Sequence, residues 1–183
     1  MTTDLTFFTN EEGKTLLDRF NRVLKTAKQV DILVGYFNFP GFYLLQEALE
    51  NVEKIRILVG MGIDKKTAGI VKAGEKRQQI LMLDNRDVIE KAEQEVIRQF
   101  DESDDSVCVE NGINRLIEWI EKGKVEIKAS RENIHAKLYI ITHHPDAPDV
   151  GRVITGSSNF TEAGLKDNLE FNVELKQVGD YEF

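Results

Sequence analysis

The chain has 183 residues, of which 41% are hydrophobic and 31% charged, and its formal net charge at pH 7 is −8. This hydrophobic content can supply one good core, so the composition excludes a disordered chain and favours a single domain over 1–183. The acidic balance argues against a protein that coats nucleic acid nonspecifically, because such binding needs a basic face.

Cysteine use and the N-terminus indicate the compartment. The single cysteine, Cys108, excludes an internal disulfide framework and is typical of a reducing environment. The opening residues, Met1 to Asp4, lack the basic and apolar regions of a signal peptide, and no apolar run approaches the ~20 residues of a membrane-spanning helix. We therefore expect a soluble, cytoplasmic protein with no membrane partner.

The first part of the chain alternates between helical and strand-like patterns. Apolar residues from Leu16 to Ala27 follow helical spacing, and the segment from Thr9 to Glu12 resembles a capping box at the start of that helix. A buried strand is predicted over 30–37, a helix over 42–49 and a second strand over 55–61. This β-α-β order predicts a parallel sheet.

Helices are predicted in the middle of the chain and strands towards its end. Two amphipathic helices are indicated by Val88, Ala92, Val96 and Phe100, and by Ile113, Leu116, Ile117 and Ile120. Strands are expected over 125–129, 134–141, 150–155 and 170–176, with a short helix over 161–166. The fold class is therefore α/β, a mixed and largely parallel sheet flanked by helices, with a helical insertion around 62–123.

Two short motifs near the C-terminus carry the chemistry. His135 and Lys137 lie two apart in a predicted strand, so both should point to one face together with Tyr139, while Leu138 and Ile140 should enter the core. The second motif, Gly156-Ser157-Ser158-Asn159, comes after another apolar run, and its small residues would let the backbone approach a ligand closely. A lone histidine is usually structural and the second motif alone is ordinary turn composition, so the signal lies in their combination.

Together, His135-x-Lys137 and Gly156-Ser157-x-Asn159 resemble the signature of the phospholipase D superfamily. The segments 159–165 and 168–172 resemble the stretch downstream of this signature in nuclease-like and helicase-associated members. Glu170 matches the position at which such nucleases carry an acid beside the catalytic histidine. One departure is Thr142, which stands where the family pattern commonly has an aspartate.

Upstream segments extend the resemblance to residues 30–175. Val34 to Phe37, Gly41-Phe42 and Ile57 to Gly60 are similar to the opening strands of phospholipase D-like domains at the N-termini of large helicases. The segment 62–123 matches no motif. The chain is therefore expected to be either the N-terminal domain of a larger helicase or restriction protein, which the resemblance favours, or a compact stand-alone dimer.

The resemblance implies a phosphodiesterase that needs neither metal nor cofactor. His135 would attack phosphorus to form a phosphohistidine, while Lys137 and Asn159, with Ser157 assisting, hold the non-bridging oxygens. Glu170 would accept a ring N–H and so hold a histidine in the useful tautomer. Because the chain has one copy of each motif, the second histidine must come from a homodimer with one shared site.

Two classes of function remain open. The first is a nuclease, with DNA as the expected substrate and RNA as the alternative. The second is a catalytically weak module that binds nucleic acid or dimerises a larger helicase or restriction system; phospholipid hydrolysis is a poor third.

Two further clusters have ordinary explanations. His143-His144-Pro145-Asp146 is interpreted as a structural loop rather than a metal site, and solvated faces account best for the basic residues that would otherwise line a groove, namely Lys65, Lys66, Lys72, Lys76, Arg77, Lys124, Lys128 and Arg131.

Overall fold

The strands of the computed structural model, which describes residues 6–81 and 106–176, form one sheet in the order β1-β7-β6-β5-β2-β3-β4. Their bounds are β1 Thr6–Thr9, β2 Ala27–Phe37, β3 Lys54–Ile63, β4 Val125–Ala129, β5 Leu138–His143, β6 Gly151–Gly156 and β7 Phe171–Leu175. β2, β3 and β4 run parallel, and the remaining neighbours pair antiparallel. The predicted β-α-β unit and the mixed α/β sheet are confirmed, but the sheet is not largely parallel as predicted, because four of the six pairings between the described strands are antiparallel.

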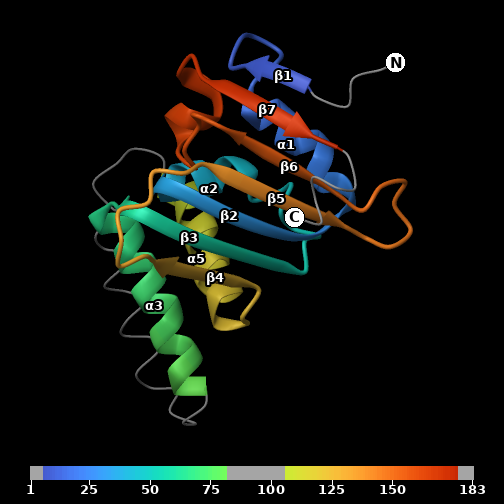
Figure 1. The fold of residues 1–183 in the computed structure, drawn as a ribbon. Coiled ribbons are helices and arrows are strands. Elements are labelled where there is room, and N and C mark those ends of the chain that lie inside the picture. The colour runs from blue at the N-terminus through green and yellow to red at the C-terminus, as the bar shows by residue number, and fades with distance from the viewer. Residues whose placement is uncertain (1–5, 82–105, 177–183) are drawn as a thin grey trace.

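Helices lie on one side of this sheet. They are α1 Leu16–Val23, α2 Phe39–Leu45, α3 Lys65–Leu81 and α5 Ser106–Glu121, with a short 3-10 helix, η1 Leu24–Thr26, and a π-helical turn, η2 Ala163–Asp167. In Figure 1, α1, α2 and α5 lie behind the sheet, and α3 packs against α5. The helix predicted from Ile113 to Ile120 is confirmed as part of α5. The helix predicted from Val88 to Phe100 and the side chain of Cys108 fall outside the described residues.

The start of the chain differs from the prediction. Thr6–Thr9 forms β1, which pairs with β7, so the capping box proposed over Thr9 to Glu12 is wrong. The chain then turns through Gly13, whose φ of 72° suits a residue without a Cβ. The actual cap is Thr15, whose Oγ1 accepts the Asp18 N–H at 3.0 Å while the Asp18 carboxylate accepts the Thr15 N–H at 3.1 Å.

The core occupies the helix side of the sheet. Tyr139 and Ile141 of β5 are fully buried there, with the Tyr139 ring against Phe20 and Phe160. Leu138 and Ile140 are only half-buried on the opposite face, so the prediction that these two enter the core is wrong. The reason is that all the described helices lie on the Tyr139 side, which alternation along the strand cannot reveal.

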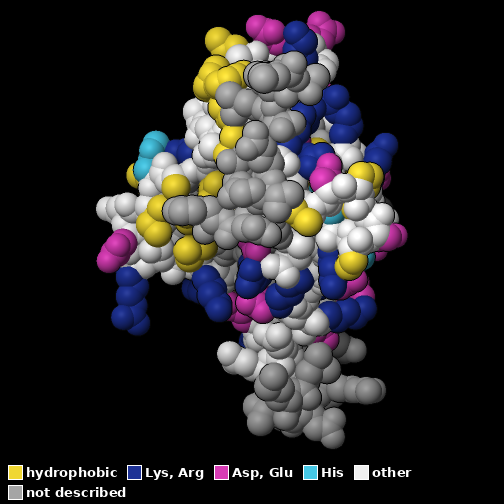
Figure 2. Space-filling model, turned by 45° about the vertical axis from the view of Figure 1, so that its right-hand side comes forward, with side chains coloured by type: hydrophobic (Ala, Val, Ile, Leu, Met, Phe, Trp, Pro, Cys, Tyr) yellow, Lys and Arg dark blue, Asp and Glu magenta, His cyan; other side chains and the backbone are white. Residues whose placement is uncertain are grey.

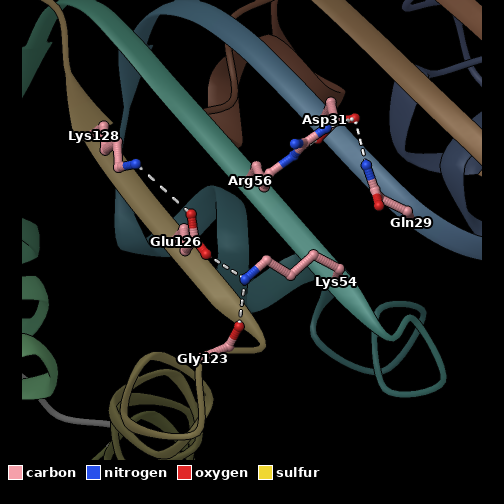
Figure 3. A network of polar contacts seen from close by, with 7 residues as sticks. All are labelled: Gln29, Asp31, Lys54, Arg56, Gly123, Glu126 and Lys128. Carbon is pink, nitrogen blue, oxygen red and sulfur yellow. Dashed lines mark hydrogen bonds and ion pairs between the residues drawn. The ribbon is translucent and has the colours of Figure 1, made fainter. Parts of the chain in front are cut away.

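The face of the sheet towards the viewer in Figure 1 carries an ionic ladder instead of a helix among the described residues (Figure 3). Arg56 binds both carboxylate oxygens of Asp31, with an Nη2 to Oδ2 distance of 2.7 Å. Lys54 contacts Glu126 and donates to the Gly123 carbonyl at 2.7 Å. Such cross-strand pairs of opposite charge stabilise neighbouring strands modestly.

Two of the basic residues considered for a groove are engaged elsewhere in the described part of the chain. Arg77 is buried and pairs with Glu121, and the Lys124 ammonium lies 3.7 Å from the centre of the Trp119 ring. On the face seen in Figure 2, basic side chains are interleaved with acidic ones. Within 6–81 and 106–176, moreover, no helix combines the length and apolar character that crossing a bilayer requires.

Candidate active site

The two sequence motifs meet where the parallel strands β2 and β3 end. The loop that carries His135 lies directly on β3, where the Ile134 N–H donates to the Gly60 carbonyl at 3.3 Å. A Cβ at Gly60 would stand 2.1 Å from the Ile134 carbonyl oxygen, so only glycine permits this approach. A Cβ at Gly35 would meet Asn159 Oδ1 at 3.3 Å and His135 Cδ2 at 3.4 Å. The His135 ring and the Asn159 carboxamide therefore lie close together over β2.

His135 and Lys137 form the pair that their spacing predicts. Lys137 Nζ lies 2.8 Å from His135 Nε2 and 3.2 Å from the His135 carbonyl oxygen. A lysine ammonium can only donate, so Nε2 is the acceptor and the proton of the neutral ring is assigned to Nδ1. The two side chains were predicted to share one face of a strand, but neither residue lies in a strand, and His135 is exposed whereas Lys137 is buried. The reason is that β5 begins only at Leu138.

Burial tunes the lysine. Removal from solvent lowers the pKa of the Lys137 ammonium below the usual lysine value, and the nearby Glu170 carboxylate offsets part of this shift. Glu170 is thus close enough to the pair to influence it electrostatically.

Ser157 and Glu170 form a second cluster beside the first. Ser157 Oγ donates to Glu170 Oε2 and accepts the Phe171 N–H at 3.0 Å. Asn168 Nδ2 donates to the other Glu170 oxygen at 3.3 Å. Within one chain, Glu170 therefore contacts Ser157 and Asn168, whereas the sequence analysis expected it to accept from a histidine ring.

Asn159 is held by β2. Its Oδ1 accepts the Tyr36 N–H at 3.0 Å, which directs the amide nitrogen away from the strand. A Cβ at Gly164 would stand 2.5 Å from the Asn159 carbonyl oxygen, so η2 packs tightly against the same residue. The motif asparagine is thus positioned by two elements before any substrate binds.

Two supporting residues were not identified from sequence. Tyr139 donates its phenol proton to the Ser158 carbonyl at 2.8 Å, and burial raises its pKa, so it remains a neutral donor. Asn172, fully buried, donates to Ser158 Oγ at 2.9 Å. The sequence contained little indication of this role, because Tyr139 and Asn172 reach Ser158 only when β5, β6 and β7 pair.

The other histidine cluster lies at the opposite end of β5. His143 Nδ1 is 2.9 Å from Asp149 Oδ1, and Asp149 also pairs with Arg152. Burial acts to raise the Asp149 pKa, but the hydrogen bonds and charges of Arg152 and His143 outweigh it, and the pKa lies below its usual value. This loop is held by ion pairs. In the described part of the chain, no three His, Cys, Asp or Glu side chains are grouped to hold a metal ion.

Comparison with known proteins adds a family match. A family model described as "Cardiolipin synthase, PLD-like domain" matches residues 20–181. Among curated proteins, no sequence matches this one.

Solved structures of similar fold include one yeast protein and two bacterial proteins. Yeast tyrosyl-DNA phosphodiesterase has a TM-score of 0.49 at 15% identity over 93% of this chain, which spans only 32% of that enzyme. NucT from Helicobacter pylori has a TM-score of 0.48 at 11% identity, with 97% of this chain and 88% of that chain covered. Nuc from Salmonella typhimurium, described as a phospholipase D family member, has a TM-score of 0.46 at 17% identity, with 97% and 86% covered.

Proposed function

The chain belongs to the phospholipase D superfamily, and on that premise we propose that it is a phosphodiesterase that cleaves nucleic acid without a metal ion. The observation that carries the proposal is the contact between Lys137 Nζ and His135 Nε2, in which Nε2 is the acceptor and therefore carries the lone pair that a nucleophile needs. DNA is the proposed substrate, with RNA as the alternative.

The first step is attack by His135 Nε2 on phosphorus. As the phosphate binds, Lys137 transfers its hydrogen bond from the imidazole to a non-bridging oxygen, which frees the Nε2 lone pair. A P–N bond forms and the P–O bond to the leaving nucleoside breaks. The amide nitrogen of Asn159 donates to a remaining oxygen, where negative charge develops, and the Ser157 hydroxyl joins it by turning its proton from Glu170 to the phosphate.

Both steps need another histidine. In the first step its imidazolium donates a proton to the departing alkoxide, and in the second step the resulting neutral ring accepts a proton from the water that cleaves the P–N bond. We propose that a second copy of the chain supplies this ring, in a twofold dimer with one shared site. His135 Nδ1–H contacts no acceptor among the described residues of its own chain, and Glu170 of the second subunit is the proposed acceptor.

Mixed dimers provide the test of the shared site. The parent protein is unfolded and refolded jointly with increasing amounts of the His135→Ala variant, and nuclease activity is assayed in EDTA. If both histidines are needed, an equal mixture keeps about a quarter of the activity of the same total amount of parent protein, because the share of fully parental dimers varies as the square of the parent fraction. The control diluent is His144→Ala, which leaves activity proportional to total protein. A linear decline with His135→Ala would show that each chain works alone.

The lowered pKa of Lys137 predicts that activity declines on the alkaline side of the pH profile, the alkaline limb, at a lower pH than an ordinary lysine would cause. As the pH rises through this lowered value the ammonium loses its charge, so kcat/KM should fall at a lower pH than an ordinary lysine would produce. Lys137→Arg keeps its charge throughout, so its reduced activity should show no such limb. The measurement is a pH profile of oligonucleotide cleavage. Lys166→Arg, on the exposed η2 surface, should leave the parental profile unchanged, and an identical limb in Lys137→Arg would contradict the assignment.

The competing function is a weak binding or dimerisation module of a larger helicase or restriction system. It predicts oligonucleotide binding and dimer formation without EDTA-resistant turnover. Fusion to a helicase motor remains a separate proposal, which the mass of the native gene product tests.

A further inference from the structure

A pocket of about 470 Å³ lies beside the candidate active site at the ends of β2 and β3. We call it the Tyr36 pocket; among its lining residues are Tyr36, Gly62, Ile63, Asp64, Thr161 and Ala163. The volume falls within the usual range of small-ligand sites. The mechanism above makes no use of it.

The pocket is joined to the site through one hydrogen bond. The Tyr36 N–H donates to Asn159 Oδ1 at 3.0 Å, so the residue that lines the pocket is in direct contact with the residue proposed to hold phosphate. The Tyr36 side chain is 45% exposed, and its ring atoms stand 3.5 Å from the position of a Cβ built at Gly62. The ring thus rests on the Gly62 backbone with much of its surface available to a ligand.

The charge of the pocket suits a neutral group. Its charged lining residue is Asp64, and both carboxylate oxygens of Asp64 are engaged by Thr67, from N–H at 3.0 Å and from Oγ1 at 2.5 Å. No lysine or arginine is among the residues that line it. The pocket therefore lacks a cation for a phosphate among the described residues, whereas the neighbouring candidate site has Lys137. A nucleotide has an anionic phosphate and a flat, neutral base, so the two places could bind these two parts.

We propose that the Tyr36 pocket receives the nucleobase next to the scissile phosphate, stacked on the Tyr36 ring. This inference rests on the proposed function and names a specificity residue for it. Stacking on an aromatic side chain tolerates any base, so the subsite requires an unstacked base rather than a particular sequence. Loss of one such contact weakens binding by about 5- to 150-fold.

The test measures binding rather than cleavage. In a His135→Ala background, which prevents turnover, fluorescence anisotropy compares two labelled probes: a thymidine strand of about eight nucleotides, and a strand of equal length with abasic sugars. Tyr36→Ala should weaken the thymidine complex about 5- to 150-fold and change the abasic complex less than about twofold. Tyr36→Phe, which keeps the ring, and Val150→Ala, which shortens an exposed apolar side chain beside His143 at the far end of β5, serve as controls and should bind as the background does.

Several outcomes would overturn the subsite. Equal weakening of both probes by Tyr36→Ala would assign the residue to the dimer interface or to Asn159 alone. No weakening, or equal affinity of the background protein for both probes, would also refute base stacking. Failure of the proposed function gives a different result. If the parent protein does not cut DNA in EDTA but still binds in a base-dependent way, the proposed hydrolysis is refuted and the subsite is retained.

Discussion

Replacing His135 with alanine is expected to lower the EDTA-resistant cleavage of DNA by about 10³- to 10⁶-fold. The reason is that Nε2 of this ring forms the bond to phosphorus, so no other described group of the chain can take its place in the pathway proposed. The measurement is conversion of supercoiled plasmid, and of a labelled oligonucleotide, by purified protein in excess EDTA.

The matched control is His144→Ala, a half-buried histidine that directly follows β5, which should retain parental activity. His135 is exposed and hydrogen-bonds only Lys137 among the described contacts, so its loss should leave the unfolding midpoint within the range of ordinary surface substitutions. Equal products from the parent and the His135→Ala variant would defeat the enzyme proposal and favour the binding module.

Replacing Glu174 with alanine is expected to destabilise the fold by about 3–5 kcal/mol, the usual cost of removing one partner from a buried ion pair. Glu174 of β7 is 1% exposed and faces the helix layer, where it binds Arg19 of α1 and Arg152 of β6, the latter with an Nε to Oε1 distance of 3.1 Å. Without the carboxylate, two largely buried guanidinium groups lose a shared counter-charge. Chemical denaturation at fixed protein concentration measures the change.

An exposed ion pair supplies the comparison. Glu162 and Lys166 lie four apart and pair at 2.7 Å near η2, with both side chains well exposed. Glu162→Ala should cost about 0.5 kcal/mol or less. If the Glu174→Ala and Glu162→Ala variants unfold at the same denaturant concentration, the buried network does not hold β7 to α1.

Much of the fold was predictable because its signals are local. Apolar runs placed β2, β3, β4 and β6 to within a few residues, and helical spacing placed α5. β1 was missed because a strand of four residues at a sheet edge has little pattern of its own and exists through pairing with β7. The start of β5 was predicted too early, because β-branched composition continues into a loop that Gly60 allows to cross β3.

The candidate site was predictable as a set of residue types, less so as a set of contacts. His135 and Lys137 were paired correctly because only one residue separates them. The Ser157 to Glu170 contact depends on the antiparallel register of β6 and β7, which no local pattern encodes. The place of Tyr36 beside the site also depends on distant contacts, because Gly35 lets the Asn159 amide lie against β2 and Gly62 lets the Tyr36 ring lie against β3.

The sequence by itself determined the family and the alternation of helices and strands, and it predicted an imidazole, an ammonium, a hydroxyl and a carboxamide for a phosphate site. Spacing and side-chain chemistry are properties of short segments, so these conclusions need no knowledge of distant contacts. The tertiary structure alone decided which sheet face is the core, that Lys137 is desolvated against His135 Nε2, and that Glu170 binds Ser157 within its own chain. Burial, register and electrostatic environment arise from segments more than a hundred residues apart, such as Tyr36 and Asn159, and exist only once the chain has folded.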